Sequence, residues 1–272
     1  MKALGFVVVC LLHLFSVGTR TEPNAVYDAT FYTASFGTSF TALASGWCYA
    51  VERQLVRPLK ARGMVTLSMV ITDRKSISGC STLLRIKLGN QKNAERRVAS
   101  KNQINVKLLK MHKLPVRSKV YMWLDIDIRP TAHSSDWFRY FAHDCALDHR
   151  NGIALTPTQH PEKGRYNGGL FAYSGRGCID HWKSRILRSM SSSSSLQRDQ
   201  PPLKMAVDSP FCNVTHMPAY TQGFFKPTLW SFGDRRGHPY AFMHFTGRSK
   251  VALKIGERLE QRWRARSLED KT

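Results

Sequence analysis

The sequence predicts an α/β fold in which helices flank a mixed, mostly parallel sheet within a single domain. Two observations lead to this prediction. Residues 25–72 hold a strand pattern, a helix pattern and a second strand pattern in succession, which is a β-α-β unit. Residues 118–124 (SKVYMWL) are almost continuously apolar, as expected of a central parallel strand that is buried on both faces.

The β-α-β unit opens with a strand over residues 25–33, which are rich in β-branched and aromatic residues. A helix over residues 40–62 follows, because apolar residues recur there at helical spacing. Pro58 bends or ends this helix, and Gly63 is its stop signal. A strand over residues 65–72 completes the unit.

Further elements are expected along the rest of the chain, and a run of serines at residues 191–195 indicates a loop between them. They are a helix over 93–114 ended by Pro115, short strands at 153–156 and 169–173, a helix over 178–190 and a last strand at 240–245.

The first twenty residues resemble a targeting segment. Lys2 precedes an apolar run at residues 3–17, and small residues follow it. The run is shorter than the ~20 residues that a membrane-spanning helix needs. We expect residues 1–20 to be a cleaved signal peptide or a short signal anchor, followed by a domain over 21–254 and a charged tail over 255–272. The chain is then secreted or held in the ER or Golgi lumen.

The cysteines and one sequon agree with that compartment. Outside the leader an odd number of cysteines remains, widely spaced and unlike a zinc ribbon, so we expect at most two disulfides and one free thiol. The five residues are Cys48, Cys80, Cys145, Cys178 and Cys212. Asn213-Val214-Thr215 is an N-glycosylation sequon.

The net charge of +22 favours acidic partners such as nucleic acids, anionic membranes, polyanionic glycans or nucleotide diphosphates. The leader argues against a nuclear role, so no nucleic acid is expected. One function class that remains open is a secreted basic protein that binds polyanions or glycans without catalysis.

The strongest chemical motif is Asp125-Ile126-Asp127, which directly follows the apolar strand at 118–124. Ligands of parallel α/β sheets bind beyond the carboxyl ends of strands, and two carboxylates there can hold Mg²⁺ or Mn²⁺. The alternative is a pair of solvated carboxylates, or a turn at 127–130.

Three further motifs follow in order. Asn167-Gly168-Gly169 offers an amide and a close backbone approach, although a turn before a buried strand explains it too. Asp199-Gln200 places a carboxylate beside an amide, or starts a helix. His244 can ligate a metal ion at a strand end, while Gly247 and Lys250 suit phosphate; a structural histidine is the alternative.

These motifs, in this order, resemble glycosyltransferase family 8, which contains glycogenin and galactinol synthase. The wording Trp123-Leu124-Asp125-Ile126-Asp127 and His244-Phe245-Thr246-Gly247 is also similar to glycosyltransferase family 34, which contains galactomannan galactosyltransferases and yeast mannosyltransferases. Either resemblance implies the Rossmann-like GT-A fold, a UDP-sugar or GDP-mannose donor, a carbohydrate or glycoconjugate acceptor, Mn²⁺ (or Mg²⁺) and retention of configuration.

The resemblance also implies a role for each motif residue. Asp125, Asp127 and His244 resemble the metal ligands, and Asp125 also resembles a ribose contact. The implied ligands of the diphosphate are Gly247 and Lys250. The implied donor-sugar contacts are Asn167, Gly168 and Gly169 together with Asp199 and Gln200, one of which would lie nearest the anomeric carbon as the catalytic group. Lys107 resembles a basic residue that precedes the Asp-x-Asp strand.

The sequence departs from family 8 in three places. Val251-Ala252 stands where Pro-Trp is usual, and the N-terminal nucleotide-binding segment is not recognisable around residues 28–37. The spacing between Lys107 and the Asp-x-Asp strand also differs from that of the family. The base, uracil or guanine, is therefore left open. A second rival is a metal-dependent hydrolase built from His133, His143, Asp144, Asp148 and His149, whose spacing fits no His-Glu-x-x-His motif.

Overall fold

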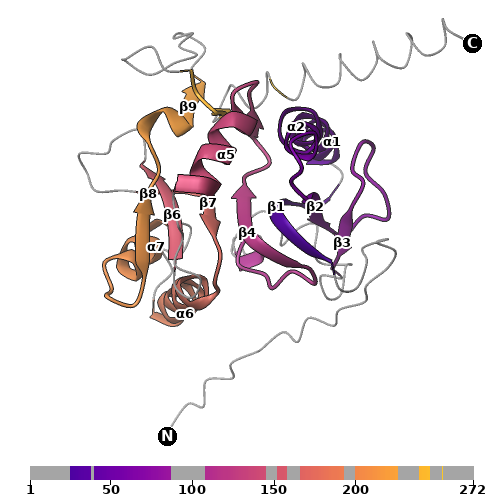
Figure 1. Cartoon of the computed structure of the whole chain (residues 1–272). Coiled ribbons are helices and arrows are strands. Elements are labelled where there is room, and N and C mark those ends of the chain that lie inside the picture. Colours follow the sequence, from indigo (N-terminus) through magenta and orange to yellow (C-terminus); the bar gives the residue numbers. More distant parts are fainter. Residues whose placement is uncertain are drawn as a thin grey trace, which may run out of the picture.

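A computed structural model gives the arrangement of the chain and describes residues 25–37, 40–86, 108–144, 152–157, 166–192, 200–225, 239–245 and 253. They form a seven-stranded sheet, a three-stranded sheet and the helices that cover them (Figure 1). The elements are β1 (Val26–Ser35), α1 (Thr41–Val51), a π-helical turn (Glu52–Val56), α2 (Arg57–Lys60), β2 (Thr66–Thr72), β3 (Leu83–Arg85), β4 (Arg117–Leu124), β5 (Ile128–Pro130), α5 (Ser134–Asp144), β6 (Gly152–Pro157), β7 (Tyr166–Tyr173), α6 (Gly177–Ser192), α7 (Gln200–Val207), β8 (Asn213–His216), a 3₁₀ turn (Ala219–Thr221), β9 (Gln222–Phe225) and β10 (Phe242–Phe245).

The large sheet has the order β3-β2-β1-β4-β7-β6-β8 and is mostly parallel. β7 alone runs against its neighbours, since it pairs antiparallel with both β4 and β6. The start of β7 therefore lies beside the end of β4, and Leu124 pairs with Leu170. This confirms the predicted mixed sheet and brings Asn167 to Gly169 next to Asp125.

Side chains alternate along the central strands between two buried layers, as the pleat requires. In β4, Met122 and Leu124 belong to the layer that contains α1 and α5, whereas Trp123 belongs to the layer that contains α6 and α7. Figure 1 shows these helices on opposite sides of the sheet. Both faces of β4 are thus covered at its end, which is why residues 120–124 are continuously apolar.

The helix after β1 is continuous from Thr41 to Lys60 and contains the π-helical turn just before Pro58. In this turn the Arg57 N–H donates to the carbonyl of Glu52, five residues earlier, as in a π-helix. Proline has no N–H to donate, so the wider turn eases its entry into the helix. The helix ends at Lys60, and the turn that follows contains Gly63, whose φ of 82° is in the left-handed region expected of a stop signal.

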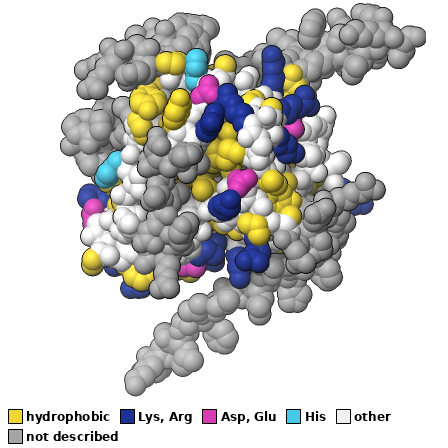
Figure 2. Space-filling view, in the orientation of Figure 1, with side chains coloured by type: hydrophobic (Ala, Val, Ile, Leu, Met, Phe, Trp, Pro, Cys, Tyr) yellow, Lys and Arg dark blue, Asp and Glu magenta, His cyan; other side chains and the backbone are white. Residues whose placement is uncertain are grey.

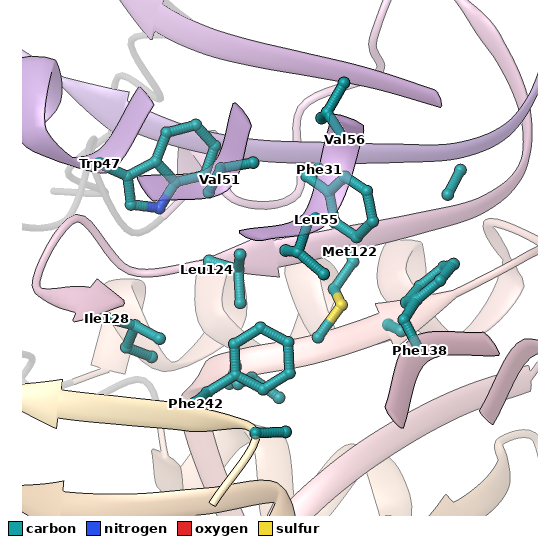
Figure 3. Close-up of a cluster of buried hydrophobic side chains, with 14 of the residues drawn as sticks. Phe31, Trp47, Val51, Leu55, Val56, Met122, Leu124, Ile128, Phe138 and Phe242 are labelled. Carbon is teal, nitrogen blue, oxygen red and sulfur yellow. The ribbon is translucent and has the colours of Figure 1, made fainter. Parts of the chain in front are cut away.

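The small sheet packs β10 between β5 and β9. Phe242 of β10 points into the layer of α1 and α5, together with Leu124, Ile128 and Phe138 (Figure 3). β10 pairs antiparallel with β5, so that His244 lies opposite Ile128. This pairing carries His244 to the segment that follows β4.

Each of the two buried layers contains one disulfide, which agrees with the predicted maximum of two. Cys48 of α1 is bonded to Cys80, and Cys178 of α6 is bonded to Cys212. Cys145 lies outside the described residues.

Several elements were not predicted. β3, β5, β8 and β9 are three or four residues long, and α5 contains His143 and Asp144, two of the hydrolase candidates. The leader at 1–20 and the tail over 255–272 lie outside the described residues, as does the predicted helix 93–114 up to residue 107. Of the loop predicted at 191–195, Ser191 and Ser192 belong to α6, and residues 193–195 are not described. No helix within the described ranges is long and apolar enough to cross a membrane.

Candidate metal centre

Two carboxylates and an imidazole come together at the carboxyl end of β4. Ligand atoms of Asp125, Asp127 and His244 all lie within 4.8 Å of one another. Asp127 and His244 are each 8% exposed, and Nε2 of His244 is 3.5 Å from Oδ1 of Asp127. Two hard oxygen ligands and one borderline nitrogen suit a divalent cation such as Mn²⁺ or Mg²⁺.

The Asp125 carboxylate is held by its neighbours. Its backbone N–H donates to the Gly169 carbonyl at 2.7 Å, and its own carbonyl accepts from Ile128 N–H at 2.8 Å. The indole Nε1–H of Trp123 donates to Oδ1 at 2.6 Å. A Cβ on Gly169 would lie 2.7 Å from Asp125 Oδ2, so this glycine is needed for close approach and not for positive φ.

Asp127 is fixed by the small sheet and by a buried arginine. Its carbonyl accepts from Phe245 N–H at 2.9 Å, which ties it to the strand that carries His244. The Arg129 guanidinium donates to the carbonyls of Ile126 at 2.7 Å and Leu43 at 3.0 Å. The segment between the two aspartates is therefore anchored to α1.

Lys110 supplies a buried positive charge at this site. Its Nζ donates to the Gly168 carbonyl at 2.8 Å and lies 5.8 Å from the ring centres of Trp123 and Trp182. Burial raises the pKa of Asp125, and the Lys110 ammonium opposes part of this rise. Lys107, the basic residue suggested by the sequence, lies outside the described residues.

Asn167 and Gln222 connect the start of β7 to the imidazole. Asn167 Oδ1 accepts from Gly169 N–H at 2.9 Å, and Asn167 Nδ2 donates to Gln222 Oε1 at 2.9 Å. Gln222 Nε2 lies 2.8 Å from Nδ1 of His244. The pairing of β6 with β7 shifts register after Leu155, so Thr156 lies opposite Asn167 and its hydroxyl also donates to Gln222 Oε1 at 3.1 Å.

The other expected site residues are only partly placed. Gln200 begins α7, but its side chain is outside the described part of the chain, as are Asp199, Gly247 and Lys250. Of the hydrolase candidates, His133 is exposed before α5, and His143, Asp144, Asp148 and His149 have no described side chains. Among the described residues, the one group of acidic, histidine or cysteine side chains that could hold a metal is Asp125, Asp127 and His244.

Sequence reasoning missed Lys110 and Gln222. Lys110 follows two leucines in a basic segment, and nothing in that composition marks it as buried. Gln222 is a lone amide in a short strand. Its only local indication is the run of apolar and aromatic residues around it.

Solved structures with a similar arrangement include glycosyltransferases. The galactosyltransferase LgtC, in complex with donor and acceptor sugar analogs, matches with a TM-score of 0.50 at 13% sequence identity, over 80% of this chain and 87% of LgtC. A glycosyltransferase involved in the glycosylation of the major capsid of PBCV-1 matches with a TM-score of 0.46 at 13% identity, over 85% of this chain and 98% of that one. No protein-family model and no curated protein sequence matches the chain. The likeness to LgtC is one of fold, and it confirms the predicted GT-A fold.

Proposed function

We propose that this protein is a metal-dependent glycosyltransferase that moves a hexose from a UDP-sugar or GDP-mannose to a hydroxyl of a carbohydrate or glycoconjugate acceptor, with retention of configuration. The observation that carries the proposal is the meeting of Asp125, Asp127 and His244 at the carboxyl end of β4. In a fold shared with LgtC, this is the edge of the sheet where a ligand is expected.

Asp125, Asp127 and His244 would hold the cation, which we propose to be Mn²⁺ or Mg²⁺. A bound divalent cation is a Lewis acid that stabilises negative charge on a departing diphosphate. The two carboxylates are largely fixed before any ligand arrives, because Trp123 bonds to Asp125 and Arg129 bonds to the carbonyl of Ile126 between the two aspartates. Such preorganisation reduces the cost of orienting groups during the reaction.

Other residues of the chain would bind and orient the donor. Lys110 puts a positive charge beside Asp125 and suits a phosphate or a sugar hydroxyl. Gly247 and Lys250 are proposed for the diphosphate. Asp199 and Gln200 are proposed for the sugar, with one of them nearest the anomeric carbon. No strong base is needed opposite the leaving group if configuration is retained, since the departing phosphate oxygen can take the acceptor proton.

We further propose that the protein acts in the secretory pathway and is N-glycosylated. Two disulfides support an oxidising compartment. Asn213 is exposed at the start of β8, which ends the order of the large sheet, so the sequon is accessible. Residues 1–20 are proposed as the signal peptide or anchor.

The test is a thermal-shift screen of UDP, GDP and their sugars, each with and without Mn²⁺. A ligand of the folded state raises the melting temperature by mass action, so the nucleotide base that the protein binds is the one that gives the larger increase. Sugar release or transfer from the best donor is then measured in wild type and in Asp127→Ala. Loss of both activity and Mn²⁺ dependence in a folded variant supports the proposal, and full activity contradicts it.

One observation favours a second candidate, a basic polyanion-binding protein without catalysis. The net charge is +22, and basic side chains cover more of the face in Figure 2 than acidic ones do. Binding of a sulfated glycan that weakens with salt, in a protein that never responds to a nucleotide-sugar, would favour this candidate.

A further inference from the structure

A row of hydrogen bonds runs from the backbone of Gly169 to the imidazole of His244. It passes through the side-chain amides of Asn167 and Gln222, both of which are buried. The backbone N–H at its beginning can only donate. The direction of every later bond is therefore determined.

Because Gly169 N–H donates to Asn167 Oδ1, the Nδ2 of Asn167 must be the group that meets Gln222. Gln222 Oε1 accepts this bond and a second one from the Thr156 hydroxyl. Its Nε2 is then the atom that lies 2.8 Å from Nδ1 of His244, and Asn167 Nδ2 lies 3.4 Å from the same atom. Two amide donors thus face Nδ1, which must accept.

A neutral imidazole has one N–H and one lone pair. With Nδ1 accepting, the proton of His244 is on Nε2, which faces Oδ1 of Asp127 at 3.5 Å. This tautomer is opposite to the one a metal ligand needs at Nε2, where the lone pair must point to the cation and Nδ1–H must find an acceptor. If the Gln222 amide rotated by half a turn, its Oε1 could accept an Nδ1–H of His244. Its Nε2 would then face Asn167 Nδ2, and two donors would oppose each other.

The geometry points to Gln222 as the positioning residue that lowers the affinity of the cation site, by holding His244 in the tautomer that opposes metal ligation. This inference rests on the proposed cation site of Asp125, Asp127 and His244. A cation held weakly by the protein alone binds together with the diphosphate and leaves with it, as is usual where two carboxylates share a cation with phosphates.

The decisive variant is Gln222→Glu. A carboxylate of nearly the same shape only accepts, so it can receive the bonds from Asn167 and Thr156 and also an Nδ1–H of His244. We expect this variant to bind Mn²⁺ about tenfold more tightly than wild type in titration calorimetry without nucleotide. The same titration in a His244→Ala background separates the tautomer from simple charge attraction, because the gain should disappear there.

A second measurement needs no metal. In full-length protein with ¹⁵N-labelled histidine at mildly alkaline pH, the ring nitrogens of His244 should show the Nε2–H tautomer in wild type and the Nδ1–H tautomer in Gln222→Glu. The resonances are assigned by their loss in His244→Ala.

An Nδ1–H tautomer in wild type, a Gln222→Glu affinity no higher than that of wild type, or an equal gain without His244 would each overturn the role of Gln222 while leaving the cation site intact. Absence of Mn²⁺ binding in every variant, with or without UDP or GDP, would overturn the cation site and the proposed function as well.

Discussion

Asp125 lies so close to Gly169 that a side chain at position 169 would displace the Asp125 carboxylate at the end of β4. A Cβ built on Gly169 would be 2.7 Å from Asp125 Oδ2 and 3.1 Å from Asn167 Oδ1. The atom it would meet first is the end of a carboxylate, which can rotate away, and not backbone.

We therefore expect Gly169→Ala to fold but to lose the site. Its free energy of unfolding should stay within about 1 kcal/mol of wild type, while its dissociation constant for Mn²⁺ in the presence of nucleoside diphosphate rises at least about tenfold. Urea unfolding and titration calorimetry measure the two quantities. Gly63→Ala is the control: its φ of 82° makes alanine strained, at a cost of about 1–2 kcal/mol, with cation binding unchanged. The reverse pattern would contradict the role of Gly169.

Lys110→Met should weaken binding of the donor. The variant removes the buried ammonium that bonds to the Gly168 carbonyl and faces Asp125. Loss of the charged hydrogen bond that we propose between Lys110 and the donor corresponds to an affinity about 10- to 100-fold lower. The affinity is measured by titration of the nucleotide-sugar found in the thermal-shift screen. Lys119→Met, whose lysine is 68% exposed near the start of β4, is the matched control and should bind the donor like wild type. Equal affinity in both variants would exclude Lys110 from the donor site.

Reduction of the disulfides should destabilise the protein substantially. Each bridge closes a loop between cysteines 32 or 34 residues apart. A chain-entropy estimate for such a loop is about 3 to 4 kcal/mol per bridge. The check is urea unfolding of Cys48→Ala/Cys80→Ala and of Cys178→Ala/Cys212→Ala, each compared with oxidised wild type. Cys145→Ser, which leaves both bridges in place, should have the same free energy of unfolding as wild type. A double variant as stable as wild type would show that its bridge contributes nothing to stability.

Stability should fall in acid through Asp28 in particular. The hydrogen bond from Lys119 at 2.7 Å, together with one from Val65 N–H at 2.8 Å, lowers the pKa of Asp28. Because the pKa is lower in the folded state, ionised Asp28 stabilises the protein at neutral pH, and this contribution disappears as pH falls through the folded-state pKa.

Asp28→Asn should thus cost up to about 1 kcal/mol at pH 7, since the Lys119 partner is 68% exposed and water screens the pair. The difference from wild type should shrink below the usual carboxyl pKa of about 3.9. Urea unfolding at a series of pH values follows this difference, and a constant difference at all pH values would contradict the assignment.

The sequence predicted those strands whose burial produces a clear pattern of apolar residues. β2 and most of β1 are buried, β4 is buried toward its end, and these runs are long enough for the apolar pattern to be clear. β8 and β9 have four residues each, too few for a period to be visible. The site was predicted where motif and strand end coincide, as at Asp125 and Asp127. Lys110 and Gln222 act through contacts with residues far away in the sequence, and no local pattern indicates such contacts.

The alternation of side chains along β7 couples the hydrophobic core to the candidate site. Leu170 and Ala172 face one layer, while Phe171 and Tyr173 face the other. A shift of the strand by one residue would exchange all four between layers and would also withdraw Asn167 from Gln222. The packing of both layers and the geometry of the candidate site therefore depend on the same register of β7. An insertion or deletion between Asn167 and Tyr173 would disturb both at once.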